Sequence, residues 1–222
     1  MGLSNSTATQ PAQFSDVFSY IDDKDYSNEA VVITTGNLDV GTVIAQLFIA
    51  SQTHAGNTGN GVLTAANIEY GASAKVGRYI LTCIAASTGS GTFKLTTPEN
   101  ETVPQLLTVG TDYSSDHLII DSTTLTDGSA DFIVGDKFLI TVTSTYCAEL
   151  LEDSTNGRQT AYGILAVAAD ATLAPAYSAA VVRGEVIVNT DGLKWNNTIT
   201  AAQKNIAIAQ MKRNGLVFRN GV

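Results

Sequence analysis

The chain has 222 residues, of which 44% are hydrophobic, 7% aromatic and 15% charged, and its net charge is -9. This composition is typical of a globular chain, and the length suffices for one or two domains with buried cores. The negative charge disfavours nucleic-acid binding, because affinity for phosphates depends on clustered lysines and arginines. No apolar run reaches 18 residues, so we predict neither a nucleic-acid partner nor a membrane partner.

The N-terminal segment, residues 1–28, is rich in Ser, Thr, Asn and Asp. Its second half nevertheless carries five large apolar side chains: Phe14, Val17, Phe18, Tyr20 and Ile21. Such a segment buries too little surface by itself to offset the entropy that it loses on ordering. We therefore predict a flexible arm that becomes ordered when these five side chains bind a partner.

Two strands are predicted next, near residues 30–35 and 42–50, with turns at Gly36-Asn37 and Gly41 between them. The pattern changes at "GNTGNG". Six short strand-like runs follow, separated by turn residues: "GVLTAANI", "RYILTCIA", "GTFKLTT", "QLLTVG", "HLIID" and "KFLITVT". In the third run Phe93 and Leu95 alternate with polar residues, as in a half-buried strand. Residues 54–146 are therefore predicted to form an inserted, Ig-like antiparallel β-sandwich.

Residues 161–170, "AYGILAVAAD", form an apolar run of mostly small side chains. Alanine favours helices, but the run shows no apolar stripe of helical period, so a buried strand is the favoured interpretation and a helix is the alternative. Small side chains in such a strand would let another backbone or another subunit approach closely. A further strand is predicted in "VVRGEVIVN".

One helix is predicted near the C-terminus, within "TITAAQKNIAIAQMKRNGLVFR". Thr200 and Gln203 have the spacing of a capping box, and Asn214-Gly215 is a typical helix stop. Lys212 and Arg213 lie in the last turn, where the helix dipole favours cations. The inward face is predicted to contain Ile206, Ala209 and Met211, and a last strand to occupy residues 216–219.

Residues capable of catalysis or metal binding are few and scattered. Cys83 and Cys147 have no metal-ligand spacing and are predicted to be buried free thiols rather than a disulfide. His54 and His117, the two histidines, lack partners at the spacing of a zinc site. The aspartates at 127, 131 and 136 lack the ligand pattern of a calcium loop and are typical of turns. No G-x-S-x-G motif or phosphate-binding loop occurs, so we predict no enzyme, no metal and no cofactor.

Several stretches together resemble the head decoration proteins of tailed bacteriophages, the lambda-type capsid cement family. They are "YGILAVAAD", "AVVRGEVIVN", "LKW", "TAAQKNIAIAQMKRNGLVFR" and, near the start, "SNEAVVITTGNLDVGTVIAQ". The resemblance covers roughly residues 28–53 and 147–222. It implies a mainly β fold, with an α+β body that carries one C-terminal helix. The implied organisation is an arm (1–28), a discontinuous body (29–53 and 147–222) and an insert (54–146) that the compact family pattern lacks.

The resemblance also implies a function. The chain is expected to be a structural virion protein, made in the host cytoplasm, that binds the major capsid protein on the outer capsid surface as homotrimers at threefold axes. Capsid contacts are expected from the five apolar residues of the arm. Subunit contacts are expected from Ile164, Ala166, Ala168 and Trp195. The alternative is an adhesin or glycan-binding module whose insert binds a host-surface ligand, with Tyr113 in "TDYSSD" as its exposed aromatic residue.

Overall fold

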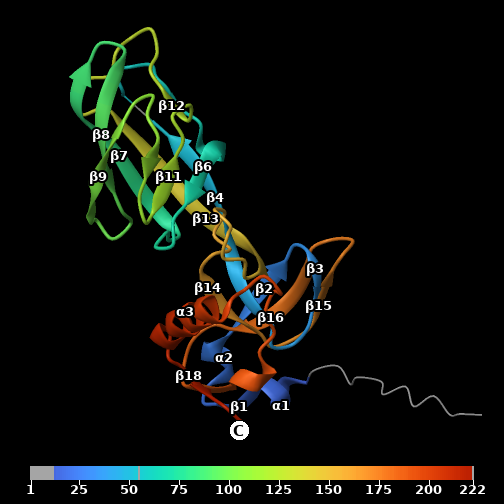
Figure 1. The fold of residues 1–222 in the computed structure, drawn as a ribbon. Helices are drawn as coiled ribbons and strands as arrows, with labels where there is room; N and C mark the ends of the chain where they lie inside the picture. Colours follow the sequence, from blue (N-terminus) through green and yellow to red (C-terminus); the bar gives the residue numbers. More distant parts are fainter. Residues whose placement is uncertain (1–12, 55, 222) are drawn as a thin grey trace, which may run out of the picture. The chain divides into compact units, whose positions relative to one another are not determined.

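The computed structural model describes residues 13–54 and 56–221, and these form two compact units (Figure 1). Unit 1 contains the described residues up to 45, together with 147–150 and those from 161 onwards. Unit 2 contains residues 46–146 and 151–160. The boundaries differ from the expected ones, because residues 46–53 and 151–160 group with the insert rather than with the body. We predict that the insert, residues 54–146, folds autonomously.

Unit 1 contains two larger sheets and one short antiparallel pair, β3 with β15. In the first, β2, β16, β14 and the start of β4 are neighbours in that order, and every pair is antiparallel. In the second, β17 pairs with β1 in the antiparallel sense and with β18 in the parallel sense. The elements are β1 (Phe18–Ile21), β2 (Asn28–Ile33), β3 (Gly36–Leu38), β4 (Val43–Thr53), β14 (Ala161–Leu165), β15 (Ala169–Ala171), β16 (Ala176–Val181), β17 (Val186–Asn189), β18 (Leu216–Arg219), α1 (Phe14–Val17), α2 (Lys24–Ser27), η2 (Thr190–Gly192) and α3 (Ala201–Arg213).

The small-residue run at 161–170 contains a strand, as predicted, but the strand is shorter than the run. β14 ends at Leu165, and β15 begins at Ala169 after a bend. At position 163 of β14 only glycine fits, because a Cβ atom there would lie 2.6 Å from the carbonyl oxygen of Val181 on β16. The close approach is made by a backbone of the same unit.

Helix α3 begins and ends as predicted. The Thr200 side chain accepts from the Gln203 N–H and the Gln203 side chain accepts from the Thr200 N–H, while Gly215 has a φ of +95° beyond the last turn. The predicted inward face is correct for Met211 and wrong for Ile206 and Ala209, which are exposed. Ala207 is buried instead, because it lies one helical turn before Met211 on the same face.

Unit 2 contains two larger antiparallel arrangements of strands and one short pair. β13, β7, β8 and β9 are neighbours in one sheet, β10, β11 and β6 in another, and β12 pairs with β5. The remaining bounds are β5 (Val62–Leu63), η1 (Ala65–Asn67), β6 (Ile68–Tyr70), β7 (Gly77–Ser87), β8 (Ser90–Thr96), β9 (Thr102–Thr108), β10 (Tyr113–Ser114), β11 (Leu118–Ile120), β12 (Leu125–Thr126) and β13 (Lys137–Glu149).

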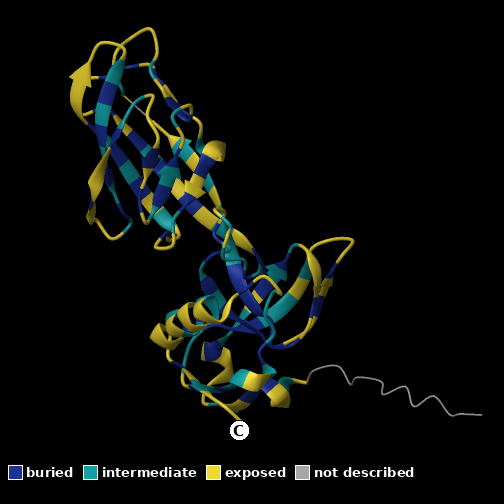
Figure 2. Ribbon diagram, in the orientation of Figure 1, coloured by how far each residue is buried: buried dark blue, intermediate teal, exposed yellow. Residues whose placement is uncertain are grey.

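Side chains from both sheets share one core in unit 2. Tyr70 and Leu118 come from the smaller sheet, and Leu81 and Phe93 from the larger one. Buried and less buried residues alternate along β8, which confirms the predicted half-buried strand (Figure 2). The predicted fold class, mainly β with one C-terminal helix, is confirmed; the Ig-like sandwich classification stays a prediction.

Phe132 lies at one end of the unit 2 core, in a loop before β13. Its ring makes edge contacts with Phe93 and Phe138, with centroids 5.1 and 5.9 Å away. The far side of the ring faces Gly61, where a Cβ atom would lie 2.2 Å from Cζ of Phe132. A glycine at 61 is therefore required for the ring to close this end of the core.

Candidate functional site

The N-terminal segment, as far as the structure describes it, packs on unit 1. Strand β1 adds to the free edge of β17, and Val17 and Phe18, 0% and 4% exposed, lie in the unit 1 core. The Phe14 ring lies 4.7 Å from that of Phe18. This differs from the expected flexible arm, because the body of the same chain supplies the apolar partner. Residues 1–12 of the expected arm lie outside the described residues.

Two glycines let the segment approach the body this closely. A Cβ atom at Gly192 would lie 2.4 Å from the carbonyl oxygen of Asp16, and one at Gly41 would lie 2.9 Å from Cγ2 of Val17 and 2.4 Å from the carbonyl oxygen of Gly192. Gly41 also has a φ of +88°, which other residues rarely adopt. The Asn189 side chain donates to the Asp16 carbonyl at 3.2 Å. Backbone-to-backbone packing thus holds α1 in place.

The exposed surface of residues 13–28 carries acidic and aromatic side chains. Of the five expected capsid-contact residues, Phe14 and Ile21 are partly buried and Tyr20 is 49% exposed. The Tyr20 hydroxyl donates to Asp22 at 2.8 Å, and this hydrogen bond, with the nearby negative charge, raises the pKa of Tyr20. The exposed face therefore offers Tyr20 and carboxylates, while Val17 and Phe18 face inward.

A charged network fastens α2 to the body. The guanidinium of Arg183 and the hydroxyl of Tyr162 both donate to the carboxylate of Glu29. Nε of Arg183 also donates to the carbonyl of Tyr26 at 3.1 Å, and its guanidinium lies 5.6 Å from the centre of the Tyr26 ring. Burial, followed by the bond to Glu29, raises the pKa of Tyr162. The network neutralises Arg183 within unit 1.

The expected subunit-contact residues lie in three different environments. Ile164 and Ala166 are buried in the core of unit 1, and Ala168 is exposed. Trp195 is partly buried, with Nζ of Lys204 5.8 Å from its ring, and lines a cavity of about 450 Å³.

Large exposed apolar side chains lie close to Ala168 in the chain. Val167 precedes it, Leu173 is 100% exposed in the turn after β15, and Tyr177 on β16 is 86% exposed. Sequence reasoning missed Leu173 and Tyr177, because a short apolar stretch within turn residues does not indicate which side chains face solvent. Together with Ala168 they make the hairpin of residues 166–178 an exposed apolar segment of unit 1.

Asp131 and Asp136, two of the titratable residues scattered along the chain, have structural roles in unit 2. Asp136 accepts from the backbone N–H groups of Thr58, Gly59 and Ile133. Burial alone would raise its pKa, but the three N–H donors outweigh burial and lower it. Asp131 accepts from the Gly89 N–H, so both aspartates fix loops, as turn residues do. The described residues contain no group of three or more potential metal ligands. No described helix is long and apolar enough to cross a membrane.

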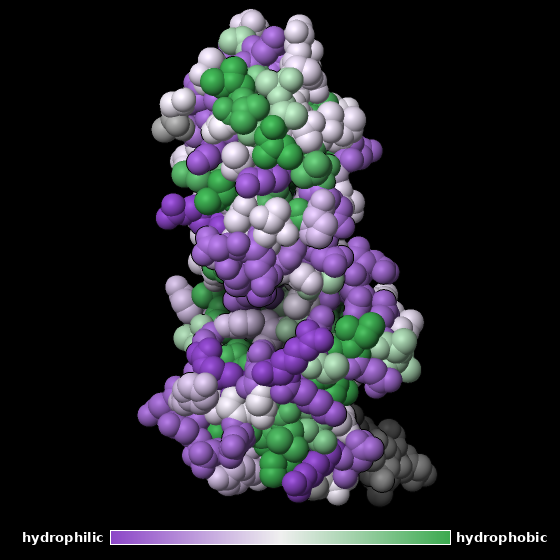
Figure 3. Space-filling view, turned by 90° about the vertical axis from the view of Figure 1, so that its left-hand side faces the viewer, coloured by the Kyte–Doolittle hydropathy of each residue, from purple (hydrophilic) through white to green (hydrophobic). Residues whose placement is uncertain are grey.

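Unit 2 offers little exposed aromatic surface. Tyr113, expected on an exposed loop, is 3% exposed and belongs to the core, which corrects that expectation. Its neighbours in the chain are polar, but β10 pairs with β11 and turns its ring inward. On the face drawn in Figure 3, hydrophobic and hydrophilic side chains of this unit lie side by side. Among the phenylalanine, tyrosine and tryptophan residues described in unit 2, Tyr146 alone is exposed.

The two cysteines are free and buried, as predicted. Burial, and then the charge of Glu29, raises the pKa of Cys147 to about 12, and burial raises that of Cys83. Burial likewise raises the pKa of Tyr70 to about 12. These groups remain protonated in the folded chain at pH values where the unfolded chain loses the protons.

We therefore expect the contribution of these groups to stability to be constant up to about pH 9 and to fall between about pH 9 and 12. A raised folded-state pKa stabilises below the unfolded-state value, and this stabilisation is lost as the pH rises through the folded-state value. Urea unfolding at pH 8, 10 and 11 measures the effect. Ellman's reagent at pH 8 should label neither thiol before unfolding and both in urea; rapid labelling of the folded chain would contradict the burial of Cys147.

Comparisons with known proteins give one strong similarity and several weak ones. No curated protein sequence matches the chain. FlgL of Xanthomonas campestris is 22% identical with a TM-score of 0.30, covering 50% of this chain and 34% of that chain. The flagellar junction protein FlgL of Legionella pneumophila is 17% identical with a TM-score of 0.31, covering 48% and 37%. This chain thus spans well under two thirds of the length of either FlgL. TM-scores this low do not indicate a shared fold, so no function is inferred from these structures. A family model described as Bacteriophage lambda head decoration protein D matches residues 7–216.

Proposed function

Because this chain belongs to the family of the bacteriophage lambda head decoration protein D, whose members are structural phage proteins, we propose that it binds the outer surface of a capsid lattice formed by the major capsid protein. The observation that supports this proposal is the extent of the family match, which includes most of both units. The role is mechanical: contacts spread over many sites add small interface energies and resist expansion by packaged DNA.

The proposed capsid contact is the exposed face of residues 13–28, preceded by residues 1–12. Val17 and Phe18 are unsuited to it, because they are buried in unit 1. Tyr20, Asp22 and Asp23 remain accessible and lie on the same segment. The segment that the sequence assigned to the capsid thus keeps that proposed role, with polar and aromatic groups in place of the buried apolar ones.

The proposed assembly is a homotrimer that contacts its neighbours through the hairpin of residues 166–178. Leu173 and Tyr177 expose large apolar surfaces, which in soluble proteins often mark interaction sites. Ala168, one of the expected subunit-contact residues, is exposed and lies in the same hairpin. Three capsid-binding faces on one trimer would convert weak contacts into firm attachment through effective concentration.

Co-sedimentation with purified phage heads that lack their decoration protein tests the proposal. The full-length protein should sediment with the heads in a saturable manner and behave as a trimer in light scattering. The double variant Leu173→Ser, Tyr177→Ser should be monomeric and bind at least tenfold more weakly, because multivalency is lost. Ile206→Ser, at an exposed position of α3, is the matched control and should leave both properties unchanged. Absence of saturable binding by the full-length protein would refute the proposal.

A further inference from the structure

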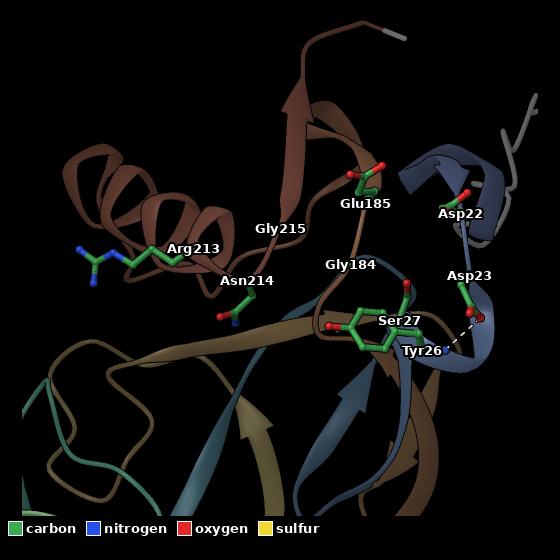
Figure 4. A pocket seen from close by; sticks show the side chains of 9 residues that line it. All are labelled: Asp22, Asp23, Tyr26, Ser27, Gly184, Glu185, Arg213, Asn214 and Gly215. Carbon is green, nitrogen blue, oxygen red and sulfur yellow. Dashed lines mark hydrogen bonds between the residues drawn. The ribbon is translucent and has the colours of Figure 1, made fainter. Parts of the chain in front are cut away.

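A polar pocket of about 510 Å³ opens in unit 1 beside α2, the turn at Gly184-Glu185 and the end of α3 (Figure 4). Asp22, Asp23 and Glu185 lie along one side of the pocket in this view, and Arg213 and Asn214 along the other. Tyr26 and Ser27 lie between the two sides. The lining comes from three segments that are distant in sequence and are brought together by the packing of residues 13–28 on the body.

The three carboxylates of the pocket have no cationic partner among the described residues. One oxygen of Asp23 caps α2, accepting from the N–H groups of Asp25 and Tyr26. The Asp22 carboxylate accepts only the Tyr20 hydroxyl, and the Glu185 carboxylate makes no hydrogen bond or ion pair with described residues. Acceptor capacity therefore remains on all three carboxylates.

The cationic side chains near the pocket point away from its three carboxylates or interact with other groups. Arg213 extends its guanidinium away from the three acids (Figure 4). Arg183, next to the pocket, is neutralised by Glu29. Nζ of Lys24 lies 6.0 Å from the centre of the Phe14 ring. The carboxylates thus give the pocket a negative potential that no described cation of unit 1 cancels by an ion pair.

Two other features of the pocket also favour a cation. Helix α3 has 13 residues and ends at this pocket, where the helix dipole places partial negative charge. Ser27 is 1% exposed and its hydroxyl oxygen has no hydrogen-bond partner among the described residues, although buried hydroxyls are normally paired. That oxygen lies in the pocket wall close to Gly184, where a Cβ atom would approach it to 2.6 Å. A ligand with N–H groups, bound in the pocket, would donate hydrogen bonds to the carboxylate oxygens and to the Ser27 hydroxyl oxygen.

From these observations we infer that the pocket receives a basic side chain, lysine or arginine, of the major capsid protein; this inference rests on the proposed function. A long basic side chain can contact more than one of the carboxylates at once. It can also lie against the exposed ring of Tyr26, which already attracts the guanidinium of Arg183. The pocket volume is large enough to admit such a side chain. Each ion pair at these exposed carboxylates is weak by itself, so the binding strength comes from several contacts made together.

The test compares two variants that each remove three negative charges. The pocket variant is Asp22→Asn, Asp23→Asn, Glu185→Gln, in which the new amide at position 23 can still cap α2 and the one at position 22 can still accept from Tyr20. The control variant is Glu69→Gln, Glu101→Gln, Asp191→Asn, at exposed positions outside the pocket, outside residues 13–28 and outside residues 166–178. In co-sedimentation with undecorated heads, the pocket variant should bind at least tenfold more weakly than wild type. The control should remain within about twofold, since distant exposed charges are screened by salt.

A second measurement follows the pocket without the capsid. Titration of the ¹⁵N-labelled protein with N-acetyl-arginine amide should shift the amide signals of Asp23, Glu185 and Gly215, with no such shifts in the pocket variant. If wild type and pocket variant bind heads equally, the inference is wrong while the proposed function stands. If wild type does not bind heads at all, the proposed function fails. Equal losses in both variants would assign the effect to net charge and overturn the pocket.

Discussion

Replacement of Phe18 by alanine is expected to destabilise unit 1 by about 3–5 kcal/mol, the usual effect of truncating a buried phenylalanine. Phe18 is 4% exposed, contacts the Phe14 ring and begins the strand that pairs with β17. Trp195 is the single tryptophan of the chain and belongs to unit 1. Its fluorescence during urea unfolding therefore reports this unit specifically, and the midpoint should move to lower urea.

Tyr20→Ala is the matched control for Phe18→Ala, because Tyr20 lies on the same strand with its side chain 49% exposed. We expect it to change stability by less than about 1 kcal/mol. If Phe18→Ala left the tryptophan transition unchanged but abolished binding to heads, Phe18 would be a capsid contact on a flexible arm after all. Loss of stability with Phe18→Ala alone supports the packed arrangement.

Replacement of Gly61 by alanine is expected to destabilise unit 2 by about 1–3 kcal/mol or more, as overpacking does. The added methyl group would lie 2.2 Å from Cζ of Phe132 and 2.5 Å from the carbonyl oxygen of Thr126. Relief requires the Phe132 ring to leave its contacts with Phe93 and Phe138 and the backbone at Thr126 to shift. Far-UV circular dichroism, which reports both units, should show an earlier transition.

The Gly61→Ala variant also tests whether the two units unfold separately. If they do, the transition followed by Trp195 fluorescence should keep its wild-type midpoint while the circular dichroism transition splits. Val62→Ala, at the exposed neighbouring position, is the control and should change neither signal. A parallel shift of both signals with Gly61→Ala would mean that the units unfold as one, against the prediction of an autonomous insert.

Local chemistry made parts of this fold predictable from sequence. The capping box at Thr200 and the glycine at 215 define α3, because both act within a few residues of the backbone that they cap. The alternation in β8 predicted which side chains are buried, since one face of that strand packs on the core. The prediction of which α3 residues are buried is partly wrong, because the helix is rich in alanine and its two faces differ little in hydrophobicity.

The features that could not be predicted depend on contacts between distant segments. The docking of residues 13–28 requires β17 and the glycines at 41 and 192, which no local pattern connects with the N-terminus. The acidic pocket combines α2 with residues 184–185 and 213–215, so its charges cannot be grouped from sequence. Tyr113 was placed on the surface because its neighbours are polar, although a two-residue strand turns it inward.

The pairing of β1 with β17 also has a consequence during synthesis. Asp16 and Asn189, which meet beside this pairing, are 173 positions apart, so β1 cannot pair until residues 186–189 have left the ribosome. At ribosomal speeds of about 5–20 residues per second, the delay is roughly 10–35 s. Unit 2 has its last segment by residue 160 and can form earlier. The nascent chain therefore carries the apolar side chains of Val17 and Phe18 uncovered while unit 2 folds, and its aggregation-prone interval ends only when the C-terminal strands emerge.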